Sequence, residues 1–68
     1  MQYKQQLTWK MLAGATWILQ TPMNQIEGQV WRPGVHSRDW IAQAGAITLG
    51  RFVDPELAKR NVEQALGI

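Results

Sequence analysis

The feature that most constrains this chain is the absence of cysteine from a sequence of only 68 residues. Without cysteine there are no disulfide bonds, no thiolate metal ligands and no cysteine nucleophile. A domain of this size buries a smaller share of its surface than a larger one, so it depends on a small apolar core. Four tryptophans can fill much of that core, because each indole buries a large area. We therefore expect one small domain, residues 1–68, with the polar segment 1–6 frayed.

The charge of the chain is mildly basic. Seven Lys and Arg residues against five Asp and Glu residues give a formal net charge of +2 and a pI near 9.5. The first acidic residue is Glu27, so positive potential is expected over the first three quarters of the chain. No stretch approaches the ~18 consecutive apolar residues of a membrane span, and no signal-peptide pattern occurs at the N-terminus. These features predict a cytoplasmic protein that does not cross a membrane.

The clearest local signal is a helix near the C-terminus. Asp54 is a typical N-cap, Pro55 suits the first helical position, and Glu56 places an acid in the first turn. Apolar residues then recur at helical spacing, and Gly67 followed by an apolar residue is typical of a Schellman ending. The pattern predicts a helix over 54–66.

The N-terminal half also shows helical spacing. The apolar residues that recur at i, i+3, i+4 and i+7 are Met11, Leu12, Ala15, Ile18 and Leu19. They predict a helix over 7–19. Thr21 followed by Pro22 is a helix-start signal, and the next apolar residues keep helical spacing as far as Val30, which predicts a second helix over 22–29. Two helices joined by a short link form a helix-turn-helix-sized unit.

The middle of the chain is expected to contain the strands. Residues 32–35 place Pro and Gly where a type II turn requires them. A β-branched pair makes 46–49 the best strand candidate in the chain. The segment 37–44 has two interpretations, a short helix capped by Ser37 or the first strand of a hairpin with 46–49. We therefore expect a mostly α fold with a small β-hairpin, an α+β domain of the winged-helix or helix-turn-helix type.

Catalytic motifs are missing from the sequence. There is no Gly-rich phosphate loop, nucleophile elbow or arrangement of paired carboxylates. His36 and Asp39 form the one acid–base pair close in sequence, and a surface role for His36 is favoured over a catalytic one. A metal site made of these two residues and Asp54 would need an unusual fold. We expect no catalytic residue, no metal and no cofactor.

The most distinctive segment is 26–36. Its spacing Ile-x-x-x-Val-Trp-x-x-Gly-Val-His resembles that of the short phage excisionases and related recombination directionality proteins. The match falls on Ile26, Val30, Trp31, Gly34, Val35 and His36. The resemblance implies a winged-helix DNA-binding fold, cooperative binding to repeated DNA sites and an integrase as partner.

Together these observations predict a small, non-enzymatic protein that binds or bends double-stranded DNA. Helix 22–29 would enter the major groove, where Asn and Gln side chains can read adenine edges, and arginines would contact phosphates. The predicted DNA-binding residues are Asn24, Gln25, Gln29, Arg32, His36, Arg38 and Arg51. Trp31 is expected to be a buried anchor after that helix.

Two other functions are open at this point. In the first, the chain is a protein-interaction module that uses exposed tryptophans and nearby arginines as anchors, since Trp and Arg dominate interface hot spots. The tryptophans concerned are Trp9, Trp17, Trp31 and Trp40. In the second, the chain is a homo-oligomer that buries its surplus of apolar residues between subunits.

Overall fold

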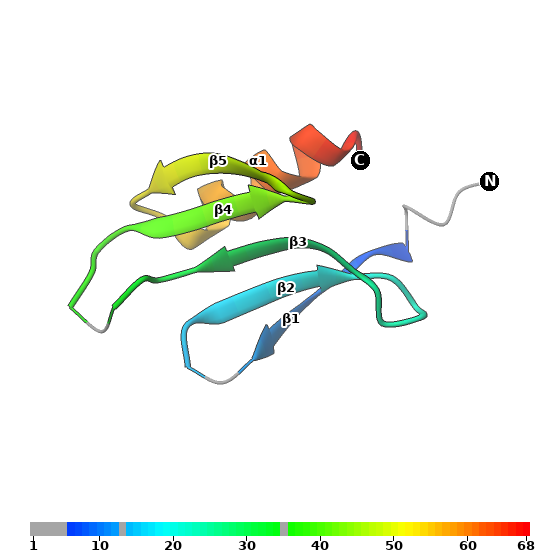
Figure 1. Ribbon diagram of the computed structural model, residues 1–68, viewed down its shortest axis with the longest axis horizontal. Coiled ribbons are helices and arrows are strands. Elements are labelled where there is room, and N and C mark those ends of the chain that lie inside the picture. The colour runs from blue at the N-terminus through cyan, green and yellow to red at the C-terminus, as the bar shows by residue number, and fades with distance from the viewer. Residues whose placement is uncertain (1–5, 13, 35) are drawn as a thin grey trace.

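The fold is a five-stranded antiparallel sheet followed by one helix, in a computed structural model that describes residues 6–12, 14–34 and 36–68 (Figure 1). The elements are β1 (Thr8–Leu12), β2 (Thr16–Gln20), β3 (Ile26–Trp31), β4 (Trp40–Ala44), β5 (Ile47–Phe52) and α1 (Pro55–Leu66). Each strand pairs with the next one along the chain, so the sheet order is β1-β2-β3-β4-β5. The expectation of a mostly α, winged-helix or helix-turn-helix domain is wrong.

The predicted helix 7–19 is instead the hairpin of β1 and β2. Its sequence is rich in β-branched and aromatic residues, which favour strands. Trp9 lies directly opposite Leu19, so the apolar residues of the two strands meet on one face of the sheet. Gly14 in the connecting turn has φ 73, a left-handed conformation that glycine adopts without steric cost. The chain therefore reverses where a helix would have continued.

The predicted helix 22–29 is a turn followed by β3. Thr21 is buried and stabilises this turn, because its hydroxyl oxygen accepts hydrogen bonds from the backbone N–H groups of Met23 at 3.2 Å and Gln25 at 3.1 Å. Asn24 has φ 66, which a helix does not allow. The Thr-Pro pair thus marks a loop in which the Thr hydroxyl hydrogen-bonds to the backbone. A Thr that caps a helix makes the same kind of bond, which explains why the pair resembles a helix start.

The strand interpretation of 37–44 is confirmed by β4, and the strand expected over 46–49 is confirmed within β5. The two strands form the expected hairpin, with a register shift between Ala42 and Gln43. The type II turn expected over 32–35 includes Val35, which lies outside the described residues. The same holds for residues 1–5 of the segment expected to be frayed.

The C-terminal helix is confirmed with both of its ends. The Asp54 carboxylate accepts a hydrogen bond of 2.9 Å from the backbone N–H of Glu56. Gly67 has φ 79, and its backbone N–H and that of Ile68 donate to carbonyls of the last turn at 3.1 and 3.0 Å. This pair of bonds is a Schellman motif.

Replacing Asp54 by alanine is expected to lower the free energy of unfolding by about 0.5–2 kcal/mol, because the first turn loses its capping oxygen. Asp54→Asn is the matched control, since Asn supplies a similar oxygen without the charge. Urea unfolding of both variants measures the difference. Equal destabilisation by Asn and Ala would contradict the capping role and would point to the charge alone.

The core lies between α1 and one face of the sheet. The helix packs on β3, β4 and β5. The buried cluster consists of Leu19, Val30, Ala42, Ala44, Ala58 and Val62. Gly28 on β3 lets the helix approach, because a Cβ at this position would overlap Val62 Cγ1. The sheet therefore has one face under the helix and another face without it.

Candidate functional site

The face of the sheet opposite α1, called the open face here, carries two rows of side chains. Directly opposite residues of an antiparallel pair point to the same side, so the strand register defines each row. The first row is Leu12, Thr16, Trp31, Ile41 and Arg51. The second row is Lys10, Ile18, Gln29, Gln43 and Thr48. Each row crosses the sheet from β1 to β5.

The charges of the open face are positive within these two rows. Lys10 lies on the outer strand β1 and Arg51 on the outer strand β5, so the two cations occupy opposite edges of the sheet. Amide, hydroxyl and apolar side chains lie between them, and none of the residues in the rows is acidic. The nearest carboxylates along β3 and β4 are Glu27 and Asp39, which lie beyond the rows at opposite ends of the sheet. The rows thus form a neutral centre with Lys10 at one edge and, at the other, Arg51, which the Asp39 carboxylate approaches to 3.9 Å.

Trp31 belongs to the open face and is not the core anchor that was expected. It lies opposite Thr16 on β2 and Ile41 on β4 and is half-buried. The tryptophans that pack against the buried cluster are Trp9, Trp17 and Trp40. Trp31 is therefore accessible to a ligand that covers the open face.

Arg32 lies on the helix side of the sheet, because adjacent strand residues point to opposite faces. Its guanidinium carbon is 5.3 Å from the centre of the Trp40 ring, a cation–π contact. Its backbone N–H donates to the carbonyl of Ala15 at 3.1 Å, which joins the end of β3 to the β1–β2 turn. This predicted DNA-binding residue is thus held on the face opposite to Trp31.

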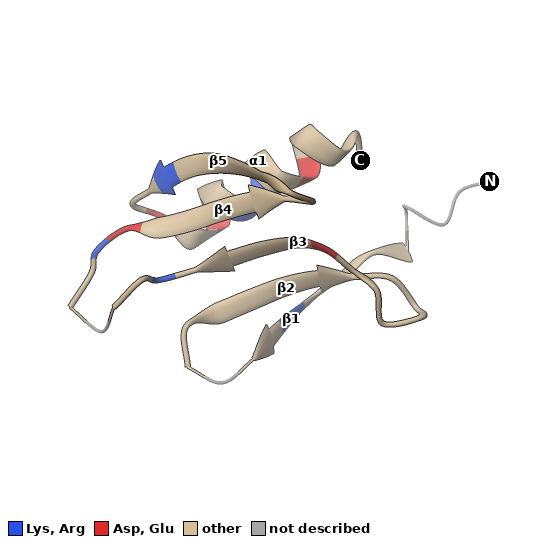
Figure 2. Cartoon of the chain, in the orientation of Figure 1, with Lys and Arg blue, Asp and Glu red and all other residues tan. Residues whose placement is uncertain are grey.

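His36 and Arg38 are exposed in the connection between β3 and β4. The Ser37 hydroxyl accepts a hydrogen bond from the backbone N–H of Asp39 at 3.1 Å, so Ser37 shapes this connection and caps no helix. Figure 2 places the basic positions of the connection and of the end of β5 at the same end of the sheet. Arg51 Nη1 is 3.9 Å from Asp39 Oδ2 with both side chains exposed, a weak pair that leaves Arg51 available to a ligand.

Asn24 and Gln25 lie in the β2–β3 turn, at the other end of the sheet from the β3–β4 connection (Figure 1). The carboxamide of Gln20 donates to Asn24 Oδ1 at 2.9 Å within this turn. The predicted set is therefore divided among the two ends, the helix side and the open face. Of its members, Gln29 and Arg51 lie on the open face.

Four polar residues of the open face were not among the DNA-binding residues predicted from the sequence. They are Lys10, Thr16, Gln43 and Thr48. Alternation of polar and apolar residues could have found Gln43, because 37–44 was already a strand candidate. The same signal could not identify Lys10 or Thr16 while 7–19 was interpreted as a helix.

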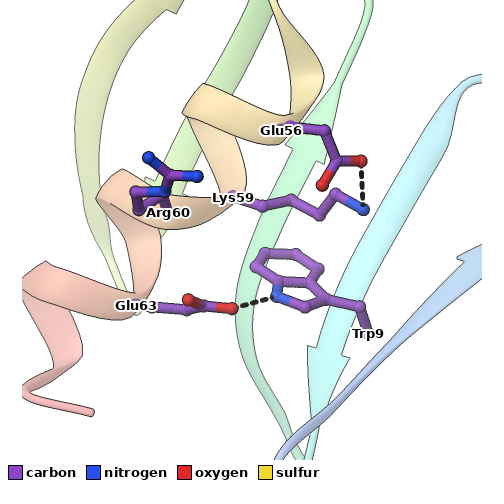
Figure 3. A pocket seen from close by; sticks show the side chains of 5 residues that line it. All are labelled: Trp9, Glu56, Lys59, Arg60 and Glu63. Atoms are coloured by element: carbon purple, nitrogen blue, oxygen red, sulfur yellow. Dashed lines mark hydrogen bonds and ion pairs between the residues drawn. The ribbon is translucent and has the colours of Figure 1, made fainter.

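Trp9 and Trp17 anchor α1 to the β1–β2 hairpin, and Figure 3 shows the contact made by Trp9. Trp9 Nε1 donates to Glu63 Oε2 at 2.8 Å. Lys59 Nζ is 3.8 Å from the centre of the Trp17 ring, and its side chain is only 12% exposed. The residues that line the pocket at this contact are Trp9, Glu56, Lys59, Arg60 and Glu63. Because Lys59 is paired with Glu56 and the rings, and Glu63 with Trp9, we assign these contacts a structural role.

Comparison with known proteins gives no match to a family model, a curated protein or a solved structure. Within residues 6–12, 14–34 and 36–68, no group of three or more His, Cys, Asp or Glu side chains is arranged to hold a metal ion. In the same ranges, no helix has the length and apolar character needed to span a membrane. The open face is therefore the best candidate for a functional site.

Proposed function

We propose that this protein binds double-stranded DNA through the open face of its sheet. The observation that carries the proposal is the distribution of charge on that face, with Lys10 and Arg51 at opposite edges and no acidic residue in the rows between them. The basic pI of about 9.5 also favours binding to a polyanion such as DNA. The sheet replaces helix 22–29 as the expected DNA-contacting element. The integrase partner implied by the excisionase resemblance stays a prediction.

The dimensions of the sheet support this mode of binding. Neighbouring strands are ~4.8 Å apart, which separates β2 from β4 by about 10 Å and β1 from β5 by about 19 Å. The major groove of B-DNA is ~12 Å wide. The axes of the three central strands therefore fall within the width of the groove, and the outer strands lie above its walls. Lys10 and Arg51 are then placed over the two phosphate backbones.

The side chains of the central strands suit the floor of the groove. Gln29 and Gln43 can exchange hydrogen bonds with base edges, and Thr16 can bond either a donor or an acceptor. Trp31 and Ile41 offer apolar contact to thymine methyl groups, which line the same groove. Contacts to phosphates would position the protein, and these central contacts would supply any preference for sequence.

Removing either edge cation is expected to weaken binding to all duplexes about equally and to lower the slope of log affinity against log salt by about one unit. The test is a fluorescence-anisotropy titration of Lys10→Ala and Arg51→Ala with random duplex DNA over a range of salt concentrations. Arg60→Ala is the matched control, because it removes one exposed cation from α1, on the other side of the sheet. Its salt slope should equal that of the parent protein.

Two results would count against this proposal. The first is no binding of the parent protein to duplex DNA at low salt. The second is an equal loss of slope for Arg60→Ala and Arg51→Ala, which would indicate attraction by net charge alone. Circular dichroism of each variant confirms that the comparison is made between folded proteins.

A second candidate is a protein-interaction module, favoured by the apolar part of the first row. Leu12, Trp31 and Ile41 lie in one row across the sheet, and Leu12 is 41% exposed. Tryptophan is a common interface anchor. An interface of this kind weakens only modestly with salt, whereas contacts to several phosphates weaken steeply. The same salt series therefore separates the two candidates.

A further inference from the structure

Two glutamine side chains face each other at the centre of the open face. Gln29 on β3 lies directly opposite Gln43 on β4, with Ile18 and Thr48 on either side in the second row. Both glutamines are half-buried among their neighbours. Their position between the cationic edges is the one that would face the bases if the sheet enters a major groove.

The two carboxamides differ in how they are held. Gln43 Nε2 donates one hydrogen bond to the carbonyl of Gly45 at 2.9 Å, which leaves its other N–H and its oxygen for a ligand. Gln29 makes no side-chain hydrogen bond with any of the residues that the structure describes. The pair therefore combines one oriented carboxamide with one that makes no hydrogen bond among the described residues.

We infer that Gln29 and Gln43 recognise adenines in neighbouring base pairs of the bound duplex, an inference that rests on the proposed DNA-binding function. A Gln carboxamide pairs with the major-groove edge of adenine by donating to N7 and accepting from the N6 amino group. The bond to Gly45 uses only one of the two N–H groups of Gln43, so this two-bond contact stays open to it. The expected ligand is thus duplex DNA with an adenine in each of two adjacent base pairs.

The test begins with a preferred duplex selected from a random pool by the parent protein. Each adenine of that duplex is then replaced, one at a time, by one of two analogues. The first is 7-deazaadenine, which has a carbon atom in place of N7, and the second is unsubstituted purine, which lacks the N6 amino group. At the contacted adenines, each replacement should weaken binding ~5- to 150-fold, the range expected for one base contact. Adenines elsewhere in the duplex should tolerate both replacements.

The protein side of the test uses Gln29→Ala and Gln43→Ala. Each variant should bind the preferred duplex more weakly than the parent and should become insensitive to the analogue at its own adenine. Gln64→Ala is the matched control, because Gln64 is an exposed glutamine on α1. It should retain the full response to every analogue.

Two outcomes are distinguishable. If the parent binds duplex DNA but no adenine analogue affects it, the inference is wrong and the proposed function stands. The same holds if Gln29→Ala and Gln43→Ala keep the response of the parent to every analogue. If the parent binds no duplex at all, both the inference and the proposed function are wrong.

Discussion

Replacing Leu19 by alanine should remove a large part of the free energy that keeps this protein folded. Leu19 is 1% exposed, lies in the buried cluster under α1, and is opposite Trp9 on one side and Gly28 on the other. Truncating a buried leucine costs about 2–5 kcal/mol, because the apolar transfer energy is lost and a cavity is left. A domain of 68 residues has a total stability of roughly 3–10 kcal/mol. Urea unfolding followed by circular dichroism should show a much lower midpoint or an unfolded protein.

Leu12→Ala is the matched control for this prediction. Leu12 lies on the neighbouring strand β1 but belongs to the open face and is 41% exposed. Its truncation should change the free energy of unfolding by no more than about 0.5 kcal/mol, as is usual for surface positions. A loss as large as that of Leu19→Ala would show that the open face is packed in solution, which would contradict its assignment as a binding surface.

The C-terminal helix was predictable because its signals are local. The N-cap, the proline at the first helical position and the glycine at the end act through bonds within a few residues of each helix end. The cap bond from Glu56 to Asp54 spans two residues and needs no other part of the chain. The hairpin of β4 and β5 was partly predictable for the same reason, since a short turn joins its strands.

The N-terminal half was not predictable from spacing, because residues at helical spacing can also fall on paired strands. Ile26 and Val30, which were assigned to one helix face, both lie in β3, but a register shift beside Gln20 separates them. Val30 is buried opposite Trp17, and Ile26 is exposed opposite Gln20. What decides between the two structures is pairing with other strands, such as that of Trp17 with Val30. Such contacts between distant parts of the chain override the weak preferences of a local segment.

The candidate site was anticipated in residue type but not in position. Gln29 and Arg51 were identified as polar or basic residues suited to DNA, and both lie on the open face. Trp31 and Arg32 are neighbours in sequence, yet the strand places them on opposite faces. Only the register of the sheet could group Gln29 with Gln43, because they are on different strands.

Gly28→Val is expected to destabilise the protein by about 1–3 kcal/mol or more, because extra carbon atoms would be forced into a packed interface. A Cβ at Gly28 would overlap Val62 Cγ1 and would lie 3.3 Å from the backbone oxygen of Gln43. The helix would have to move away from β3, or β3 would have to move toward the open face. Urea unfolding measures the loss, and Gly34→Ala is the control, because nothing lies within 4 Å of a Cβ at that position.

The cause of this effect is steric overlap with the helix, and a second substitution can test it. Val62→Ala removes the methyl group that a side chain at residue 28 would meet, at its own cost in stability. In a double-mutant cycle, Gly28→Val and Val62→Ala together should therefore destabilise less than the sum of the single changes, with a coupling of about 0.5–3 kcal/mol. Strict additivity would show that the two residues are not in contact. The packing of α1 on β3, which leaves the other face of the sheet open, would then be wrong.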